Sequence, residues 1–286
     1  MPNVSLTSSV QQFIIVGFPG FQDLKSKTLF SAFFLTAYLL ICLGNLTIIL
    51  TLTMDENLHK PMYVLVCSLA ILDIAFSSVT VPRILAILMF DSNISFDGCF
   101  VQLFLFHAVG SSQSFLLMLM AYDRFVAICN PLRYPTIMTN RVILKFMHLY
   151  CELASVVRLA CADISVNNYV TLAIAMSVMI IPLTYILYSY VRIIMSVLKI
   201  ASSEGRVKAF STCGTHLVVI FIFLLTAVCV HISNRIPGTS EDVRIMAAGV
   251  QNVIPPLMNP VIYCLRAKEI RDSFVKTLRK CKILSF

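Results

Sequence analysis

The chain has 286 residues, of which 58% are hydrophobic and 13% are charged, and its formal net charge is +8 at pH 7. A water-soluble domain of this length could not bury so much apolar surface, so we expect lipid to be its solvent. In a soluble protein the excess of basic residues would suggest a nucleic-acid partner. Here Lys and Arg gather in short segments between apolar runs, which is typical of membrane topology, and we expect no nucleic acid as partner.

The sequence contains none of the motifs G-x-S-x-G, H-E-x-x-H or the P-loop, so we expect no enzyme. Its ten cysteines form no C-x-x-C pair, which argues against zinc or thioredoxin chemistry. A channel or transporter is disfavoured because the apolar runs show no internal repeat and no ring of charges at mid-membrane.

Residues 1–27 are polar and contain the sequon Asn3-Val4-Ser5. They lack the basic start, short apolar core and cleavage site of a signal peptide, so the first span is expected to direct insertion. We predict an extracellular N-terminus over 1–27 with a glycan on Asn3.

Six apolar runs are long enough to cross about 30 Å of hydrocarbon as tilted helices. The fold class is therefore predicted to be all-α, a polytopic membrane helix bundle. The runs cover about 28–54, 61–89, 100–128, 169–200, 210–232 and 243–265.

The distribution of charge requires a seventh crossing. Lys and Arg concentrate in the segments 130–145, 202–208 and 266–286, and the positive-inside rule puts all three in the cytoplasm. Two cytoplasmic segments must be separated by an even number of crossings. Only the run 169–200 lies between the first two, so one crossing is missing there.

The candidate for this crossing is the stretch 142–166, which carries Glu152 and Arg158 near its centre. Each such charge costs about 2.5–3.5 kcal/mol on insertion scales. The sequence therefore leaves a conflict open between the charge of the loops and the hydrophobicity of this stretch.

Four segments carry a resemblance to a known family. They are LHKPMYVLVCSLAILD at 58–73, MAYDRFVAICNPLRY at 120–134, KAFSTCGTHL at 208–217 and PPLMNPVIYCLRAKEI at 255–270. In this order they resemble the signatures of the odorant (olfactory) receptors, a branch of the rhodopsin-like G-protein-coupled receptors. FPGF at 18–21 and NRIPG at 234–238 resemble the fish-like, class I branch.

The resemblance implies a seven-span bundle over 28–266 in the plasma membrane and a cytoplasmic tail at 267–286, if 142–166 crosses. It also implies a small odorant, acidic and water-soluble in class I, and a stimulatory heterotrimeric G protein as partners. In the family, RVILKFM at 141–147 would lead into a full fourth span, most of which is missing here. The alternative function is thus a truncated receptor-like product, from deletion, splicing or a gene-model artefact, that inserts but does not signal.

The resemblance assigns the G-protein switch to Asp123 and Arg124 and to Asn259, Pro260 and Tyr263. A buried ion pair is a poor stability device but suits a two-state switch. Pro260 removes a helix hydrogen bond and lets Tyr263 change its packing. By themselves, Asp123 and Arg124 could also mark a membrane boundary, and Pro260 could be a tolerated membrane proline.

Asp73 is the acid inside the second run, and in the family this position helps to hold a sodium ion with Asn45 and Asn259 nearby. Many odorant receptors have a Glu facing it where this chain has Gln113. Losing that second carboxylate should weaken a cation site, and a hydrogen-bonded polar cluster is the alternative. We predict no other cofactor.

For the ligand, the resemblance points to the outer halves of the third, fifth, sixth and seventh spans. Arg235 could pair with a ligand carboxylate, or lie at the membrane boundary with its charge in water. The histidines could equally be satisfied polar core residues. The predicted ligand-binding residues are His107, Gly110, Ser111, Ser112, His231 and Arg235.

The family forms a disulfide from the start of the third span to the outer loop, which implies Cys99–Cys151 here if Cys151 is outside. Cys161 matches a cysteine whose partner lies in the missing part, so we expect it to be unpaired. In the tail, Ile270, Phe274 and Leu278 are spaced as on an amphipathic helix that would lie on the anionic inner leaflet, with Cys281 as a palmitoylation candidate.

Overall fold

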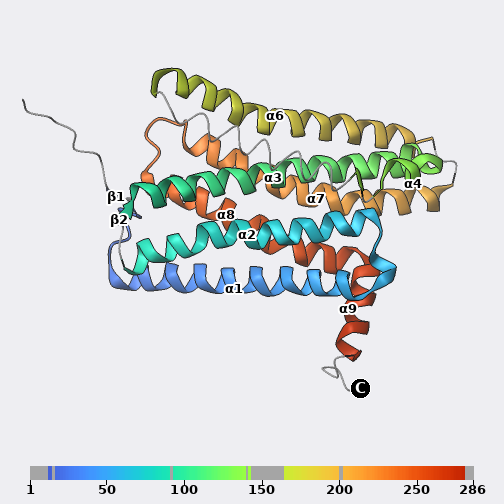
Figure 1. Ribbon diagram of the computed structural model, residues 1–286, viewed down its shortest axis with the longest axis horizontal. Coiled ribbons are helices and arrows are strands. Elements are labelled where there is room, and N and C mark those ends of the chain that lie inside the picture. Colours follow the sequence, from blue (N-terminus) through green and yellow to red (C-terminus); the bar gives the residue numbers. More distant parts are fainter. Residues whose placement is uncertain are drawn as a thin grey trace, which may run out of the picture.

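The computed structural model describes residues 12–14, 17–90, 93–139, 141–142, 164–199 and 202–280. These residues form a bundle of long helices that run side by side (Figure 1). Six helices contain segments long and apolar enough to cross a membrane, which confirms the predicted all-α bundle. They are α1 (Leu24–Met54), α2 (Pro61–Met89), α3 (Phe96–Cys129), α6 (Ile164–Val197), α7 (Ser203–Ser233) and α8 (Glu241–Arg266).

Helices begin before the apolar runs where a capping side chain precedes them. Asp23 accepts a hydrogen bond from the backbone N–H of Ser26 and starts α1, and this bond holds the pKa of Asp23 below its usual range. Ser95 and Ser240 cap α3 and α8 in the same way. The apolar runs alone therefore marked the part of each helix suited to lipid, while the caps set where the helix starts.

The two ends of the bundle carry different short elements. One end, the strand end, holds β1 (Gln12–Ile14) and β2 (Asn93–Ser95), which pair antiparallel and were not predicted. The other end, the tail end, holds the remaining short helices, and α9 leaves the bundle at an angle there (Figure 1). These helices are η1 (Glu56–Leu58), η2 (Pro131–Arg133), α4 (Tyr134–Ile137) and α9 (Lys268–Lys280).

Helices α3 and α6 pack against each other and point in the same direction. Tyr122 contacts Tyr185 with ring centroids 6.2 Å apart, and further along Cys129 Sγ lies 3.1 Å from Ser196 Oγ. From the first contact to the second, the residue numbers increase along α3 and along α6 alike. The two helices are therefore parallel, as the ribbon shows (Figure 1). The end of α3 and the start of α6 therefore lie at opposite ends of the bundle. The predicted stretch 142–166, which lies between them, is mostly outside the described residues.

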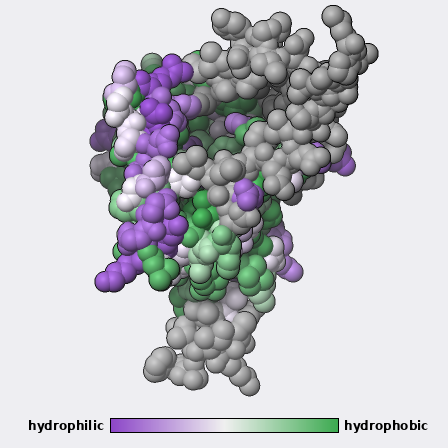
Figure 2. Space-filling model, turned by 90° about the vertical axis from the view of Figure 1, so that its left-hand side faces the viewer, coloured by the Kyte–Doolittle hydropathy of each residue, from purple (hydrophilic) through white to green (hydrophobic). Residues whose placement is uncertain are grey.

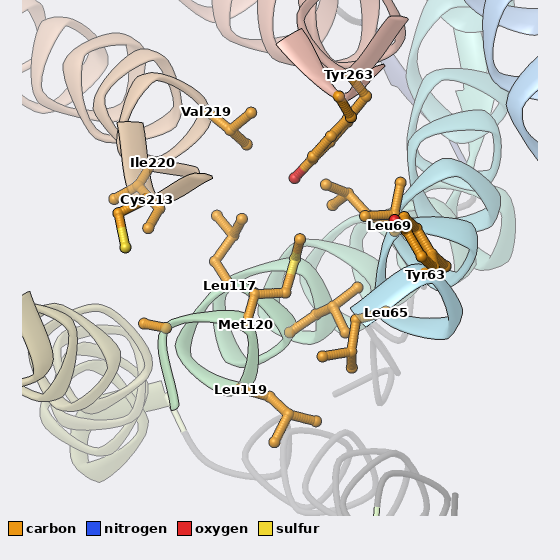
Figure 3. Packing of buried hydrophobic residues seen from close by; sticks show 14 of the residues in the cluster. Tyr63, Leu65, Leu69, Leu117, Leu119, Met120, Cys213, Val219, Ile220 and Tyr263 are labelled. Atoms are coloured by element: carbon orange, nitrogen blue, oxygen red, sulfur yellow. The ribbon is translucent and has the colours of Figure 1, made fainter. Parts of the chain in front are cut away.

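The larger of the two buried hydrophobic clusters lies mainly between α2, α3, α7 and α8, in the half of the bundle nearer the tail end. The smaller one lies nearer the strand end and joins α1, α2 and α8. Figure 3 shows side chains from all four helices converging, with Tyr263 of α8 pointing into the space between them. Many residues on the outer surface are apolar and exposed, such as Leu43 on α1 and Phe221 on α7. Lipid is the solvent that such a surface requires.

The segment before α1 is packed onto the strand end, although composition alone indicated only a polar extension. Phe18 is 4% exposed and stacks on Phe30 with centroids 5.2 Å apart. The backbone N–H of Gly20 donates to both carboxylate oxygens of Asp242, over 3.2 and 3.1 Å. Figure 2 looks at this end and shows hydrophilic residues gathered along one side of it, beside apolar ones. The segment thus ties α1 to the start of α8.

Candidate functional site

A buried ion pair lies at the tail end of α3. Arg124 donates from Nε to Asp123 Oδ2 over 2.9 Å and from Nη2 to the same oxygen. Tyr134 donates its hydroxyl to Asp123 Oδ1 over 2.7 Å. Arg124 is 7% exposed and Asp123 is 1% exposed. Both carboxylate oxygens are therefore occupied, and the pair is shielded from water.

The sequence after α3 explains how Tyr134 reaches Asp123. Asn130 ends α3, and Pro131 cannot continue it because proline has no backbone N–H to donate. The short η2 and α4 helices then turn the chain back under the bundle. Burial and, after it, the Asp123 carboxylate raise the pKa of Tyr134, so its hydroxyl stays protonated as a donor. This third member of the site was not among the predicted residues, although it is the last residue of the segment 120–134.

Tyr263 of α8 lies in the larger buried cluster. Its hydroxyl is 3.4 Å from Nδ1 of His216 on α7, and the two rings meet edge to face with centroids 5.8 Å apart. Both side chains are buried, at 1% and 2% exposure. His216 Nε2 and the Tyr190 hydroxyl are buried as well and have no hydrogen-bond partner. His216 was not among the predicted residues, although it stands inside the motif at 208–217.

A polar cluster surrounds Asp73 in the middle of α2. Gln113 Nε2 donates to Oδ1 over 2.9 Å, and Asn259 Nδ2 donates to Oδ2 over 2.8 Å. All three side chains are at most 5% exposed. Two amide groups thus satisfy the carboxylate from opposite helices, α3 and α8, which is the arrangement of a hydrogen-bonded cluster. The predicted sodium ion stays a prediction.

Asn45 makes no hydrogen bond to this cluster and instead donates to backbone carbonyl groups. The carbonyl of Pro256 has no helix partner, because the residue four positions on is Pro260. Asn45 Nδ2 donates to that carbonyl over 3.0 Å and to its own Ile41 carbonyl over 3.0 Å. The prolines of α8 are therefore tolerated because α1 supplies the missing donor. Pro260 itself packs against Gly44, where an added Cβ would lie 3.0 Å from Pro260 Cγ.

The predicted ligand residues of α3 divide between two faces. At about 100° per residue, His107 and Ser111 share one face, in line with the side that contacts α6 further along. Gly110 is directed at α2 instead, since a Cβ added to it would lie 3.5 Å from Phe76 Cε2. Ser111 donates to the His107 carbonyl over 2.6 Å. Ser112 is turned away from His107 by about 140° and donates to the Ala108 carbonyl over 2.8 Å. The structure thus brings His107 and Ser111 together, and it separates them from Gly110 and Ser112.

The remaining predicted ligand residues lie at the strand end of α7. His231 is in the last turn of the helix, and Arg235 follows its end at Ser233. Arg235 is exposed. Arg235 therefore lies outside the helix that carries His231, in a turn that continues to Gly238, whose φ is +83°.

Several predicted positions lie outside the described residues, namely Asn3, Cys151, Cys161 and Cys281. Cys99 is half-buried in the first turn of α3, at the strand end. The glycan, the disulfide and the palmitoyl group remain predictions.

The apolar face of α9 differs from the predicted one at its first member. Ile270 is fully buried in the core rather than available to lipid, and Phe274 is half-buried. Lys276 Nζ lies 3.7 Å from Asp55 Oδ2 in the connection between α1 and α2, although such a surface pair contributes little. The helix is thus anchored to the bundle at its start.

Comparison with known proteins covers nearly the whole chain. A family model described as olfactory receptor matches residues 34–147 and 144–281. Olfactory receptor 6B9 of Mus musculus is 36% identical over 302 aligned residues, which cover 95% of each chain. Olfactory receptor 52K2 of Homo sapiens is 36% identical and Olfactory receptor 1E16 of Mus musculus is 35% identical, each over 305 aligned residues and 96% of both chains.

Proposed function

The chain belongs to the olfactory receptor family, and from this premise we propose that it binds a small odorant in the strand-end half and activates a stimulatory G protein at the tail end. Members of the family are multi-pass membrane receptors rather than enzymes, and they respond to odorants and couple to G proteins. Our proposal goes further in three respects, namely the type of G protein, the chemical class of the odorant and the side of the membrane on which each end of the bundle lies.

The observation that carries the proposal is the buried pair of Asp123 and Arg124. Both partners are held, Asp123 by two donors and Arg124 by Asp123, so this is a resting arrangement. A buried ion pair contributes little to the stability of the fold, but leaving one of its charges without a partner costs several kcal/mol. Such a pair is therefore suitable as a two-state switch. A released Arg124 leaves the Asp123 carboxylate and becomes available to a G protein.

Acceptors for the released Arg124 are already present in the core. The Tyr190 hydroxyl and His216 Nε2 are buried without partners, and both lie within electrostatic reach of the Arg124 guanidinium. If Arg124 donates a hydrogen bond to one of these atoms, this bond offsets part of the free energy lost when Arg124 leaves the Asp123 carboxylate. Movement of Tyr263, next to His216, would couple α8 to this exchange.

The tail end is the cytoplasmic end in this proposal. The basic segments at 130–145, 202–208 and 266–286 all adjoin helix ends that meet there. The parallel packing of α3 and α6 supports a crossing by 142–166, because the chain between these helices joins opposite ends of the bundle. The N-terminus is then extracellular and the C-terminus cytoplasmic.

For the odorant we propose a small, water-soluble acid, as the class I resemblance of the segments 18–21 and 234–238 implies. His107 and Ser111 would face it from α3, and His231, whose side chain is exposed at the strand end, from α7. For the cluster at Asp73 we propose hydrogen bonding without a resident sodium ion, because Gln113 and Asn259 already donate to both carboxylate oxygens.

A second candidate function is a receptor-like product that inserts but does not signal. The alignments extend over 302 and 305 residues although the chain has 286, so its relatives have residues without a counterpart here. The two parts of the family match meet at 144–147, where the sequence predicts the loss of most of the fourth span. Without that span, its neighbours lose a packing partner.

The test compares this chain with a gap-filled chimera. The chimera receives, at 144–147, the segment of mouse Olfactory receptor 6B9 that this chain lacks. Both are expressed in cells, and surface level and odorant-evoked cAMP are measured with Arg124→Gln as the inactive control. Signalling by the chain itself supports the receptor. Signalling by the chimera alone supports the second candidate, while silence of both at normal surface level contradicts coupling to a stimulatory G protein.

A further inference from the structure

An open groove runs along α1, which lies at an edge of the bundle (Figure 1). Its volume is about 350 Å³. One part of its wall is Leu257 of α8, and α1 supplies the rest, namely Leu29, Ala32, Phe33, Thr36, Ala37 and Leu40. The hollow arises because the short side chains of Ala32, Thr36 and Ala37 lie between these larger ones.

The groove opens toward lipid and extends over about one leaflet. Leu29 and Phe33 are 70% and 54% exposed, whereas Ala37 is 5% exposed and forms the floor. At a rise of 1.5 Å per residue, the groove extends about 17 Å from Leu29 to Leu40. This length is close to half of the about 30 Å of hydrocarbon in a bilayer. A single acyl chain of the leaflet at the strand end therefore matches the groove in length.

The shape of the groove does not by itself select a lipid. A hydrocarbon chain that enters it leaves other hydrocarbon behind, so the hydrophobic effect favours no particular occupant. Selection requires a polar contact at the head of the groove. Lys25 provides one, because it lies one helical turn before Leu29 and is turned only about 40° from it. Its side chain is exposed, and it takes part in no ion pair among the described residues.

The other charged residues of this turn lie on a different side of α1. Lys27 is turned about 160° from Leu29, so it is directed away from the groove. Asp23, the acid nearest to Lys25 in sequence, is turned about 160° from Lys25 and accepts a hydrogen bond from the backbone N–H of Ser26. An uncompensated ammonium group thus stands where the apolar groove begins, at the level where the predicted span starts.

We propose that this groove holds a phospholipid, by preference an anionic one, with its phosphate beside Lys25 and one acyl chain along α1. The flexible stem of a lysine lets its ammonium group follow a phosphate at the membrane surface. The acyl chain would contact Leu257, one turn before Pro260, and so fill the space between α1 and α8. This proposal goes beyond the receptor function and requires neither an odorant nor a G protein.

The test uses tryptophan fluorescence, because the chain has no tryptophan of its own. Phe33→Trp places a fluorophore in the groove. Phe221→Trp is the matched reference, since Phe221 is 63% exposed on α7 and lies outside the groove. Each purified full chain is placed in nanodiscs of phosphatidylcholine, and a lipid with brominated acyl chains, which quench tryptophan on contact, replaces an increasing share of it.

Three brominated probes are compared at both positions, namely phosphatidylglycerol, phosphatidylcholine and dibromocholesterol. The ratio of their quenching constants gives the lipid preference at each position. Lys25→Gln and its matched control Lys27→Gln are then made in the Phe33→Trp chain. Melting temperatures check that each variant is folded, and Leu40→Trp at the other end of the groove replaces Phe33→Trp if that variant does not fold.

We expect phosphatidylglycerol to be preferred over phosphatidylcholine about fivefold at Phe33→Trp and not at Phe221→Trp, because choline offsets the phosphate charge. Lys25→Gln should bring this ratio to about one, while Lys27→Gln should keep it within about twofold. About 1 M NaCl should also abolish the preference by screening, which decides the matter if Lys25→Gln does not fold.

Filling the groove tests the position of the acyl chain. Ala32→Phe should weaken quenching of Phe33→Trp by both phospholipids, because it occupies the hollow. Leu35→Phe is the control, since Leu35 is 47% exposed but turned about 120° from Leu29.

Several results would overturn the proposal. One is an equal lipid preference at the two tryptophan positions, and another is a preference that survives Lys25→Gln. Strongest quenching by dibromocholesterol would assign the groove to a sterol instead. No quenching of Phe33→Trp by any probe would mean that protein, such as a second copy of this chain, covers the groove. All of these readouts are independent of cAMP, so a silent receptor leaves the proposal standing.

Discussion

The hydroxyl of Tyr134 links the ion pair at the tail end to the segment that follows α3. It donates to Asp123 Oδ1, while Arg124 uses Oδ2, so the two donors do not compete. Removing the hydroxyl leaves the pair in place but weakens the hold on Asp123. The resting arrangement thus depends on a residue outside α3, the last one of the segment 120–134.

We predict that Tyr134→Phe raises basal cAMP. A hydrogen bond to a charged group contributes about 1.5–3 kcal/mol, so its loss shifts the switch toward the released state by about tenfold or more. The measurement is basal cAMP at matched surface level in the gap-filled chimera. The control is Tyr122→Phe, which makes the same change on the side of α3 that contacts α6. Unchanged basal cAMP in Tyr134→Phe would argue against the resting role of this bond.

Gln113 decides whether the cluster at Asp73 can hold a cation. In this chain it donates an amide N–H to the carboxylate. A glutamate there would instead bring a second carboxylate against the first, and two buried carboxylates need a shared proton or a cation. The amide of Gln113 therefore determines that the site is a hydrogen-bonded cluster rather than a cation site.

We predict that the melting temperature of this chain is the same in NaCl and in N-methylglucamine chloride, and that Gln113→Glu makes it rise with sodium. Gln102→Glu is the matched control, since Gln102 is half-buried on the same helix but donates to the Val79 carbonyl. Stabilisation of the unchanged chain by sodium would refute this prediction.

At the scale of elements, the segment before α1 holds three parts of the strand end together. Its strand β1 pairs with β2, Phe18 is buried beside α1, and Gly20 is bound by Asp242 of α8. Because Gly20 has no side chain, the carboxylate can approach its N–H closely. An added Cβ would lie 2.5 Å from Asp242 Oδ2, closer than real Cβ contacts allow.

We predict that Gly20→Ala lowers the melting temperature of the purified chain, because the loss of hydrogen bonds to a carboxylate costs about 1–3 kcal/mol. Gly214→Ala in α7 is the control, since no atom lies within 4 Å of its added Cβ, and alanine favours the helix by up to about 1 kcal/mol. If both variants melt alike, the contact with Asp242 does not stabilise the strand end.

At the scale of the whole molecule, the long helices and the family could be predicted from the hydrophobic runs and the sequence motifs. The six apolar runs correspond to six long helices, and the family match confirms the resemblance read from four motifs. The pairing of Gln12–Ile14 with Asn93–Ser95 was missed, because three-residue strands about eighty positions apart leave no periodic signal.

The parts of the site that were missed depend on tertiary packing. Tyr134 reaches Asp123 only because α4 folds back under α3, and Asn45 donates to the Pro256 carbonyl across two helices. Spacing in the sequence specifies which face a residue is on, but not which helix that face meets.

The parallel direction of α3 and α6 bears most directly on the whole account. Arg124 can act on a G protein only if α7, α8 and the tail reach the same side of the membrane as the end of α3. That requires the residues between α3 and α6 to cross the membrane, despite the cost of Glu152 and Arg158.

The decisive measurement is antibody access to an epitope placed after Phe286, in intact and in permeabilised cells, with a second epitope before Met1 as reference. We predict that the N-terminal epitope is stained in intact cells and the C-terminal epitope only after permeabilisation. Staining of both epitopes in intact cells would mean that α6, α7 and α8 are inverted relative to α3. Arg124 would then be separated from Tyr263 by the membrane, and the proposed receptor function would be contradicted.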